Sequence, residues 1–292
     1  MDARLFLRAR LDAPVLVPVA GGTAVAYTRP SPRRADDPNE DAVGVFGLGE
    51  DAAVLAVADG VGGHGKGEDA SRLALEVLAE QLAAVDPDHV DLREPIMSAI
   101  ERTNTRLLAR NPSPATTLIV ATVVRGNLRS YTVGDSELMV VGQRGKLKLR
   151  TIPHSPTGYA RESGLLSEAS ALLHDERHIL SNVLGMTGMH VAATTGLHLA
   201  PRDTVVLGSD GVFDNLFHDE IIALVRAGEP LTTAARLVDR LAQRMAGGEG
   251  DPEIPSKPDD MSFILYRQQP PSAVTLAKAR SQAAPADAPT QG

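Results

Sequence analysis

The sequence predicts an α+β fold in which two antiparallel β-sheets stack as a sandwich and pairs of helices lie outside them. Short apolar and β-branched runs at 116–124, 128–133 and 138–141, separated by turn residues, indicate antiparallel strands. Two pairs of amphipathic stretches, 68–85 with 92–110 and 218–227 with 231–246, have the periodicity of helices. Since strands and helices come in groups and do not alternate, a doubly wound parallel sheet is not expected.

The remaining elements complete this order along the chain. Further strands are expected at 24–27, 42–46, 54–58, 147–151, 203–208 and 261–266. Residues 1–21 form an N-terminal arm or an edge strand, and the main domain spans 22–267. Within it, 152–198 is predicted to be a flap that leaves the core, with one short helix around 165–173. The Pro-, Ala-, Gln- and Ser-rich segment 268–292 has the composition of a disordered tail.

Composition excludes several classes of function. The net charge is −8, no basic run is longer than Arg33-Arg34, and there is no Trp among few aromatic residues, so nucleic-acid binding is not expected. No segment approaches about 18 consecutive apolar residues and no signal peptide is evident, which predicts a cytoplasmic protein that does not span a membrane. There is no cysteine, so thiol nucleophiles and thiolate metal sites are impossible.

Acidic residues adjoin four of the predicted strands. Asn39-Glu40-Asp41 and Asp259-Asp260 each precede a strand, whereas Asp59-Gly60 and Asp210-Gly211 each follow one. Any one of these pairs is more typical of an ordinary turn. Together, at strand ends that meet at one rim of a sandwich, they would repel one another unless cations were bound. Oxygen ligands of this kind suit Mg²⁺ or Mn²⁺.

Five motifs carry a resemblance to a known family: NED at 39–41, DGVGGH at 59–64, Thr116-Thr117 followed by GDS at 134–136, SDGVFD at 209–214 and DDMS at 259–262. In this order they resemble the metal-dependent protein phosphatases (PPM, or type 2C), and DGVGGH is similar to the bacterial branch. The resemblance covers residues 22–267. It implies a four-layer α–β–β–α sandwich of two antiparallel sheets flanked by helix pairs. It also implies hydrolysis of phosphoserine and phosphothreonine in protein substrates of Ser/Thr kinases, hence a role in signalling.

The same resemblance implies roles for individual residues. Asp59 resembles the carboxylate that bridges two Mn²⁺ or Mg²⁺ ions, and Gly60 the residue that binds one ion through its carbonyl. Asp210 and Asp259 resemble further ligands, and Asp135 a ligand of a weaker third ion. Glu40 and Asp41 resemble groups that hold water at the metals, and Glu40 is also a candidate metal ligand. Two cations about 4 Å apart would activate a water for in-line attack on phosphorus. No enzyme nucleophile is then needed.

Three positions depart from the family pattern. The family usually carries a phosphate-binding Arg where this chain has Asp36, so Arg34, or else Arg33, is the candidate for that role. Val61 stands where the eukaryotic branch has a candidate acid, so protonation of the leaving group would fall to water. Glu137 follows GDS in place of the usual Arg, and the expected effect is limited to a surface salt bridge.

Other readings of the sequence stay open. His174 and His178 have the spacing of a metal-binding pair on a helix, although this segment resembles the one that joins the family's flap back to the core, where it serves packing. The chain could also be a catalytically weak regulatory or binding module with a phosphatase fold, or a hydrolase of small phosphate esters. Hydrolysis of p-nitrophenyl phosphate and of phosphopeptides distinguishes these alternatives.

Overall fold

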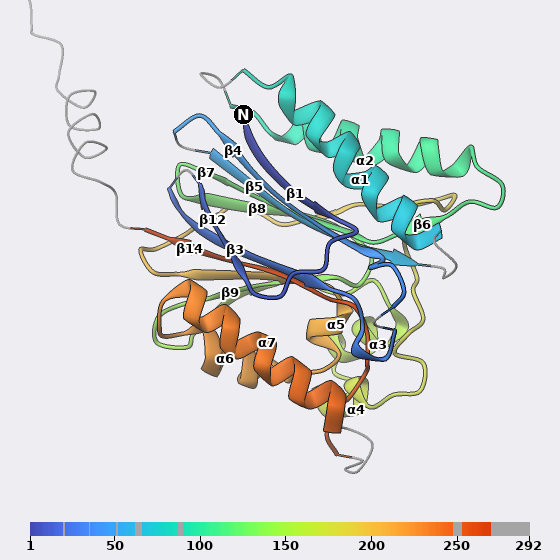
Figure 1. Ribbon diagram of the computed structural model, residues 1–292, viewed down its shortest axis with the longest axis vertical. Coiled ribbons are helices and arrows are strands. Elements are labelled where there is room, and N and C mark those ends of the chain that lie inside the picture. Colours follow the sequence, from blue (N-terminus) through green and yellow to red (C-terminus); the bar gives the residue numbers. More distant parts are fainter. Residues whose placement is uncertain are drawn as a thin grey trace, which may run out of the picture.

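The computed structural model describes residues 1–19, 21–34, 36–50, 52–61, 66–86, 90–247 and 253–269. These residues form four layers (Figure 1). Helices α1 (Lys66–Ala83) and α2 (Arg93–Leu108) cover the outer face of one sheet, and α6 (His218–Val225) and α7 (Pro230–Gly247) cover the outer face of the other. The predicted sandwich of two antiparallel sheets flanked by helix pairs is therefore confirmed.

The first sheet has the central order β1-β4-β5-β7-β8-β11, with β6 on β5 and β12 on β8, and all of its pairs are antiparallel. Its strands are β1 (Asp2–Leu7), β4 (Asp41–Leu48), β5 (Ala52–Val61), β6 (Ala115–Thr116), β7 (Leu118–Val124), β8 (Asn127–Val133), β11 (Ala192–Ala193) and β12 (Leu197–His198).

The second sheet has the order β10-β9-β13-β14-β3-β2, also antiparallel throughout. Its strands are β2 (Val15–Val19), β3 (Gly22–Arg29), β9 (Glu137–Val141), β10 (Leu147–Arg150), β13 (Thr204–Gly208) and β14 (Met261–Gln268). The N-terminal residues contribute an edge strand to each sheet, β1 to the first and β2 to the second. The proposed boundaries at 21 and 267 remain predictions.

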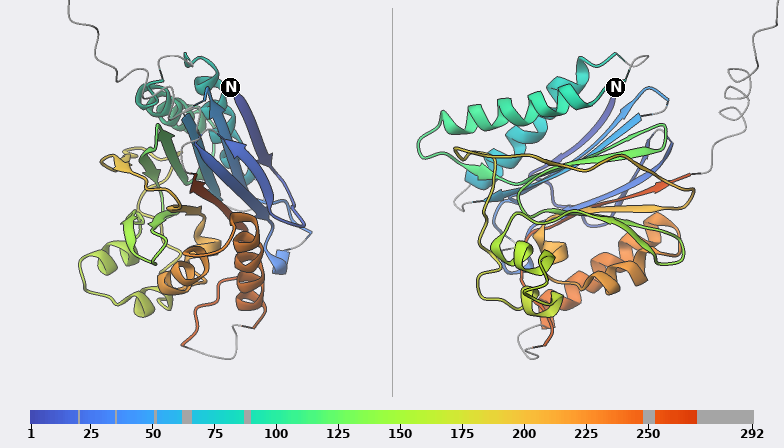
Figure 2. Two further views of the ribbon diagram at one scale, coloured as in Figure 1. Left: turned by 90° about the vertical axis from the view of Figure 1, so that its left-hand side faces the viewer. Right: turned by 180° about the vertical axis from the view of Figure 1, so that it is seen from behind.

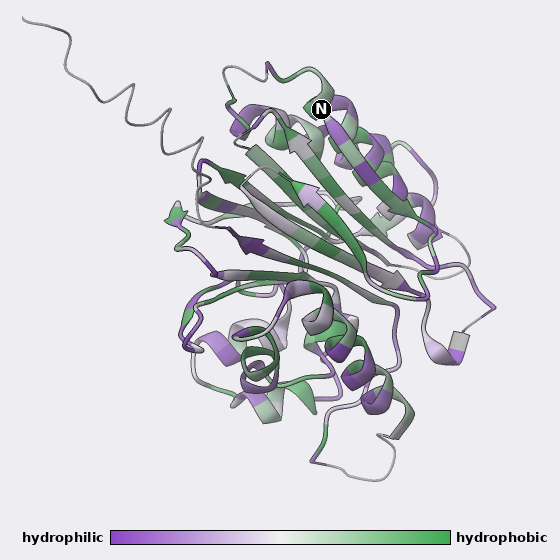
Figure 3. Cartoon of the chain, turned by 60° about the vertical axis from the view of Figure 1, so that its left-hand side comes forward, coloured by the Kyte–Doolittle hydropathy of each residue, from purple (hydrophilic) through white to green (hydrophobic). Residues whose placement is uncertain are grey.

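Apolar side chains fill the three spaces between the four layers. In β5 the side chains alternate, so that Val54 and Ala56 pack toward α1 and α2 whereas Leu55 and Val57 pack between the sheets. On the other side, Phe263 of β14 packs with α6 and α7. Figure 3 shows hydrophobic residues along the strands of both sheets. Because both faces of these strands are buried, their sequences are almost continuously apolar, which explains why they could be predicted.

The segment 152–198 differs from its prediction. It contains two short helices, α3 (Pro156–Glu162) and α4 (Glu168–Leu172), where one helix around 165–173 was predicted. Its last part returns to the first sheet, where Ala192 and Ala193 pair with β8 through backbone hydrogen bonds. The predicted flap therefore rejoins the first sheet before its C-terminal end. Figure 2 shows α3 and α4 beside the layer that contains α6 and α7.

Two further outcomes concern the C-terminal half. A short helix, α5 (Asp210–Phe213), follows β13 directly, at a position where the sequence suggested only a turn. The predicted disordered tail lies, from residue 270 onward, outside the described residues. Within the described ranges, none of the helices combines the length and the apolar character that a membrane crossing requires.

Candidate metal centre at the strand ends

The first sheet places two carboxylates opposite each other at one end of β4 and β5. Asp41 opens β4 and is the direct partner of Asp59 near the end of β5. The backbone of Asp59 is fixed by two threonines: its carbonyl accepts hydrogen bonds from the Thr117 N–H and the Thr116 hydroxyl, both at 2.8 Å. Its own N–H donates to Thr117 Oγ1 at 3.0 Å. The Thr-Thr motif therefore positions Asp59.

Gly60 lies where no side chain fits. A Cβ at this position would come within 2.3 Å of the Gly67 backbone and 2.6 Å of the Glu40 carbonyl oxygen. The Gly60 N–H donates to that same carbonyl at 3.1 Å. The start of α1 thus packs directly on the end of β5, which explains the glycines on both sides of this contact. Gly62 to Gly65 lie outside the described residues, so their role stays a prediction.

The second sheet brings its acidic residues to the same place. Asp210 is the first residue of α5, after β13, and Asp259 lies just before β14, which pairs with β13. The hydroxyl of Ser209 donates to Asp41 Oδ2 at 2.9 Å, which joins the two sheets at this rim. The carboxylate of Asp260 accepts from the N–H groups of Ser31 and Glu40, each at 2.7 Å. These buried bonds hold the strand ends together.

Gly211 supplies a sharp test of this close packing. A Cβ at Gly211 would lie 1.9 Å from the carbonyl oxygen of Asp260. We expect Gly211→Ala to lower the free energy of unfolding by about 3 kcal/mol in urea titrations, because backbone has to move. Gly247→Ala is the control, since nothing lies within 4 Å of a Cβ there. Equal stability of the two variants would contradict the packing described.

The carboxylates that meet at this rim raise one another's pKa values. Burial raises the pKa of Asp59 well above its usual range, and repulsion from Asp41 and other neighbours adds to the effect. Burial and nearby carboxylates likewise raise the pKa values of Asp41 and Asp135. For Asp259, burial and repulsion from Asp210 raise the pKa to about 7. The cluster therefore favours the binding of positive charge.

One positive charge of the protein itself lies in this cluster. The ammonium of Lys257 bonds to Asp210 Oδ2, lies 3.2 Å from Asp214 Oδ2 and lies 3.5 Å from Asp259 Oδ2. Among the residues that the structure describes, no three His, Cys, Asp or Glu side chains are grouped around a single point as metal ligands. The donor chemistry suits Mg²⁺ or Mn²⁺, whereas the present arrangement gathers three carboxylates around an ammonium.

The structure brings together most of the site residues expected from the sequence. Asp59 interacts electrostatically with Asp41, Asp135, Asp210 and Asp259. Glu40 is buried beside them, with its Oε1 2.8 Å from the point where a Gly67 Cβ would lie. The structure does not decide between the two candidate phosphate-binding arginines. Arg33 is exposed in the short helix η1 (Pro32–Arg34), and the side chain of Arg34 lies outside the described part, so the choice between them stays open.

Sequence reasoning missed two members of the cluster. Asp214 lies four residues after Asp210, one helical turn along, and burial together with repulsion from Asp210 raises its pKa to about 6 against the opposing charge of Lys257. The spacing within SDGVFD was a usable signal for this residue. Lys257 gave no such signal, because a single lysine in a polar loop is typical of solvent-exposed chain.

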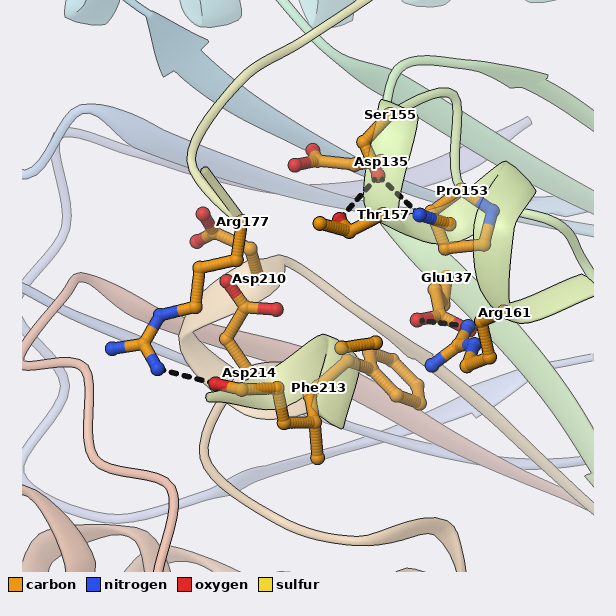
Figure 4. A pocket seen from close by; sticks show the side chains of 13 residues that line it. Asp135, Glu137, Pro153, Ser155, Thr157, Arg161, Arg177, Asp210, Phe213 and Asp214 are labelled. Atoms are coloured by element: carbon orange, nitrogen blue, oxygen red, sulfur yellow. Dashed lines mark hydrogen bonds and ion pairs between the residues drawn. The ribbon is translucent and has the colours of Figure 1, made fainter. Parts of the chain in front are cut away.

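Glu137 corrects a second expectation. It is only 4% exposed, and both of its carboxylate oxygens accept from Arg161 Nη2 at 3.1 Å. His218 Nε2 lies 3.6 Å from the same carboxylate and His218 Nδ1 lies 2.9 Å from Glu168. The glutamate that follows GDS is therefore part of a buried network that ties α3 and α4 to the core, not of a surface salt bridge. Figure 4 shows the Glu137–Arg161 pair facing Asp135, Asp210 and Asp214 across one pocket.

This network predicts a pH-dependent contribution to stability. Burial would lower the pKa of His218, but its hydrogen bonds to Glu137 and Glu168 outweigh burial and raise the pKa above its usual value. A histidine whose pKa is higher in the folded state than in the unfolded state stabilises the fold fully at pH values below its unfolded-state pKa. This stabilisation is lost as the pH rises through its folded-state pKa. We therefore expect the melting-temperature difference between wild type and His218→Asn to shrink from about pH 6 to about pH 9. A difference that stays constant or grows contradicts this.

The histidine pair of the flap has no metal-binding geometry. Helix α4 ends at Leu172, so His174 and His178 do not lie on one helix face. His174 Nδ1 instead accepts from the Glu176 N–H at 3.1 Å, which is a local turn. His154, further back, is a buried packing residue whose Nδ1 contacts the Gly134 N–H and the Asn182 side chain. His174 and His154 therefore hydrogen-bond within the fold.

Fold and site together define a class of protein: an α–β–β–α sandwich whose two sheets present carboxylates at one shared rim. The chain belongs to the protein phosphatase 2C family, whose profile matches residues 30–247. This confirms the family predicted from the sequence motifs.

Individual relatives agree with this assignment. A probable protein phosphatase 2C of rice is 28% identical over 74% of this chain. The matched region spans 58% of the length of the rice protein. A PPM Ser-Thr phosphatase of Mycobacterium smegmatis, solved with cacodylate, is 26% identical with a TM-score of 0.67 over 84% of this chain and 97% of its own. The catalytic domain of the phosphatase PstP, solved with two manganese ions, is 23% identical (TM-score 0.67; 85% and 98% covered), which shows a shared fold.

Proposed function

We propose that this protein is a metal-dependent serine/threonine protein phosphatase that removes phosphate from phosphoserine and phosphothreonine. One observation carries the proposal: both sheets bring buried carboxylates to the same rim, where Asp59 has its pKa raised by burial and by four neighbouring aspartates. Such a cluster needs cations. The names of the rice and M. smegmatis relatives support the substrate class, and cytoplasmic phosphoproteins made by Ser/Thr kinases are the proposed partners.

The proposed metal ligands are Asp59, the Gly60 carbonyl, Asp210 and Asp259, with Glu40 beside them and Asp135 at a weaker third position. Bound Mn²⁺ or Mg²⁺ would supply an activated water and neutralise charge on the phosphoryl oxygens. The manganese ions of the PstP structure support this choice of metal. Since the chain contains no cysteine, attack by water fits the residues available.

The protein's own residues hold this arrangement in place. Ser209 and Ser262 hydrogen-bond to Asp41, which leaves Asp41 fixed next to Asp59. In the proposed reaction, Glu40 and Asp41 orient water at the rim, and Arg34 binds the substrate phosphate. Val61, the second residue after Asp59, cannot donate a proton, so water protonates the leaving serine or threonine oxygen.

A direct assay tests this function. The purified protein is incubated with phosphoserine and phosphothreonine peptides in Mn²⁺, in Mg²⁺ and in EDTA, and released phosphate is measured. We expect turnover with either metal and none in EDTA. Nucleoside and sugar phosphates form the comparison set: faster turnover of these would indicate a small-phosphoester hydrolase. Absence of hydrolysis of every substrate, p-nitrophenyl phosphate included, would refute the enzyme and leave a binding module.

A further inference from the structure

The position of Lys257 in the acidic cluster is fixed by its own backbone. The Lys257 N–H donates to Asn215 Oδ1 at 2.7 Å, and Asn215 Nδ2 donates to the Lys257 carbonyl at 2.8 Å. Asn215 is completely buried and also donates to the Gly211 carbonyl at 2.9 Å. Arg177 of the flap donates to the neighbouring Ser256 carbonyl at 3.0 Å. The loop that carries Lys257 is therefore held on one side by Asn215, just after α5, and on the other side by Arg177.

From this anchored backbone, the side chain of Lys257 reaches into the carboxylates. Its ammonium contacts Asp210, Asp214 and Asp259, and its side chain is only 18% exposed. Lysine is protonated at neutral pH, and here three carboxylates surround its ammonium, so it places a positive charge in the cluster. Asp210 and Asp259 are also two of the proposed metal ligands.

We propose that Lys257 is a built-in cation that competes with a divalent ion for Asp210, Asp214 and Asp259, and so sets how tightly this end of the cluster binds metal. The proposal rests on the proposed function, since it concerns the same site. A fixed ammonium repels an incoming divalent ion and occupies carboxylate oxygens that the ion would use. At the effective dielectric constant of a protein, a unit charge within a few ångströms of the site changes the affinity for a divalent ion by about tenfold or more.

Calorimetric titration of the full chain with Mn²⁺ tests the proposal. We expect Lys257→Met to raise the affinity for the most weakly bound Mn²⁺ ion by about tenfold or more. Lys257→Arg should keep the wild-type affinity. Adding Asp214→Asn to Lys257→Met should remove the gain, because Asp214 supplies part of that position. Lys148→Met is the matched control, since Lys148 forms a comparable ion pair with Asp203 at 2.6 Å elsewhere in the fold.

Melting temperatures give a second readout that does not depend on activity. In EDTA, Lys257→Met should melt below wild type, because three carboxylates lose their counter-charge. In saturating Mn²⁺ its gain in melting temperature should exceed that of wild type. Lys257→Gln replaces the Met variant if the latter does not fold, because its amide can still hydrogen-bond to the carboxylates.

The outcomes separate this inference from the proposed function. If wild type binds Mn²⁺ and the Met and Gln variants bind it no more tightly, or if Lys148→Met shows the same gain, the role of Lys257 is refuted and the phosphatase proposal stands. If neither wild type nor any variant binds Mn²⁺, both proposals are refuted. Tighter binding that Asp214→Asn reverses supports the inference.

Discussion

Replacement of Asp59 by Asn should abolish metal-dependent hydrolysis, with turnover of phosphopeptides in Mn²⁺ falling by about 10³-fold or more. The physical reason is that Asp59 is buried among Asp41, Asp135, Asp210 and Asp259, and is the proposed carboxylate ligand shared by two metal ions. The same change should raise the melting temperature in EDTA, because it removes one of several buried charges that repel each other. Stability and activity would then move in opposite directions, as is common at functional sites.

Asp239→Asn is the control for this variant, because Asp239 is exposed on α7, which covers the outer face of the second sheet. It should leave both activity and melting temperature unchanged. Retention of Mn²⁺-dependent turnover in Asp59→Asn would show that this carboxylate is not a required metal ligand. A lower melting temperature in EDTA would show that mutual repulsion is not the dominant effect at this site.

Replacement of Glu137 by Ala should strongly destabilise the fold. Arg161 and His218 would be left buried without their shared carboxylate, and their side chains are only 9% and 12% exposed. Removing one partner of a buried ion pair costs about 3–5 kcal/mol. Urea unfolding monitored by circular dichroism measures the change.

Glu162→Ala is the matched control for Glu137. Glu162 also pairs with an arginine, Arg150, at 2.7 Å, but it is 45% exposed, so its loss should cost at most about 1 kcal/mol. If both variants lose the same stability, the network around Glu137 contributes no more than a surface pair.

The parts of the fold that could be predicted from sequence are those dictated by local pattern. Strands such as β5 are buried on both faces, and their unbroken apolar runs identify them in any context. Asp59 and Asp210 could be found because each ends such a run and is followed by glycine. Their convergence followed from the ordered motifs, and the structure places them in one electrostatic cluster.

The parts that could not be predicted depend on contacts between distant segments. Glu137 is buried because Arg161 and His218, remote in sequence, supply its counter-charges. Strand β11 is only two residues long, so its pairing with β8 is imposed by the sheet edge and not by its own composition. Lys257 joins the cluster because Asn215 holds its backbone. The sequence pattern around each of these residues gives no indication of its distant partner.

The hydroxyl of Ser209, bonded to Asp41 across the two sheets, has a consequence for the life of the protein in a cell. The rim at which this bond lies contains residues from the N-terminal and the C-terminal halves of the chain. A partly folded chain therefore cannot present the complete set of acidic groups. Divalent ions would then bind the finished fold in preference to any intermediate, and each bound ion would stabilise it by mass action. Under the proposed function, a falling metal supply would both stop the reaction and shorten the protein's lifetime against proteases.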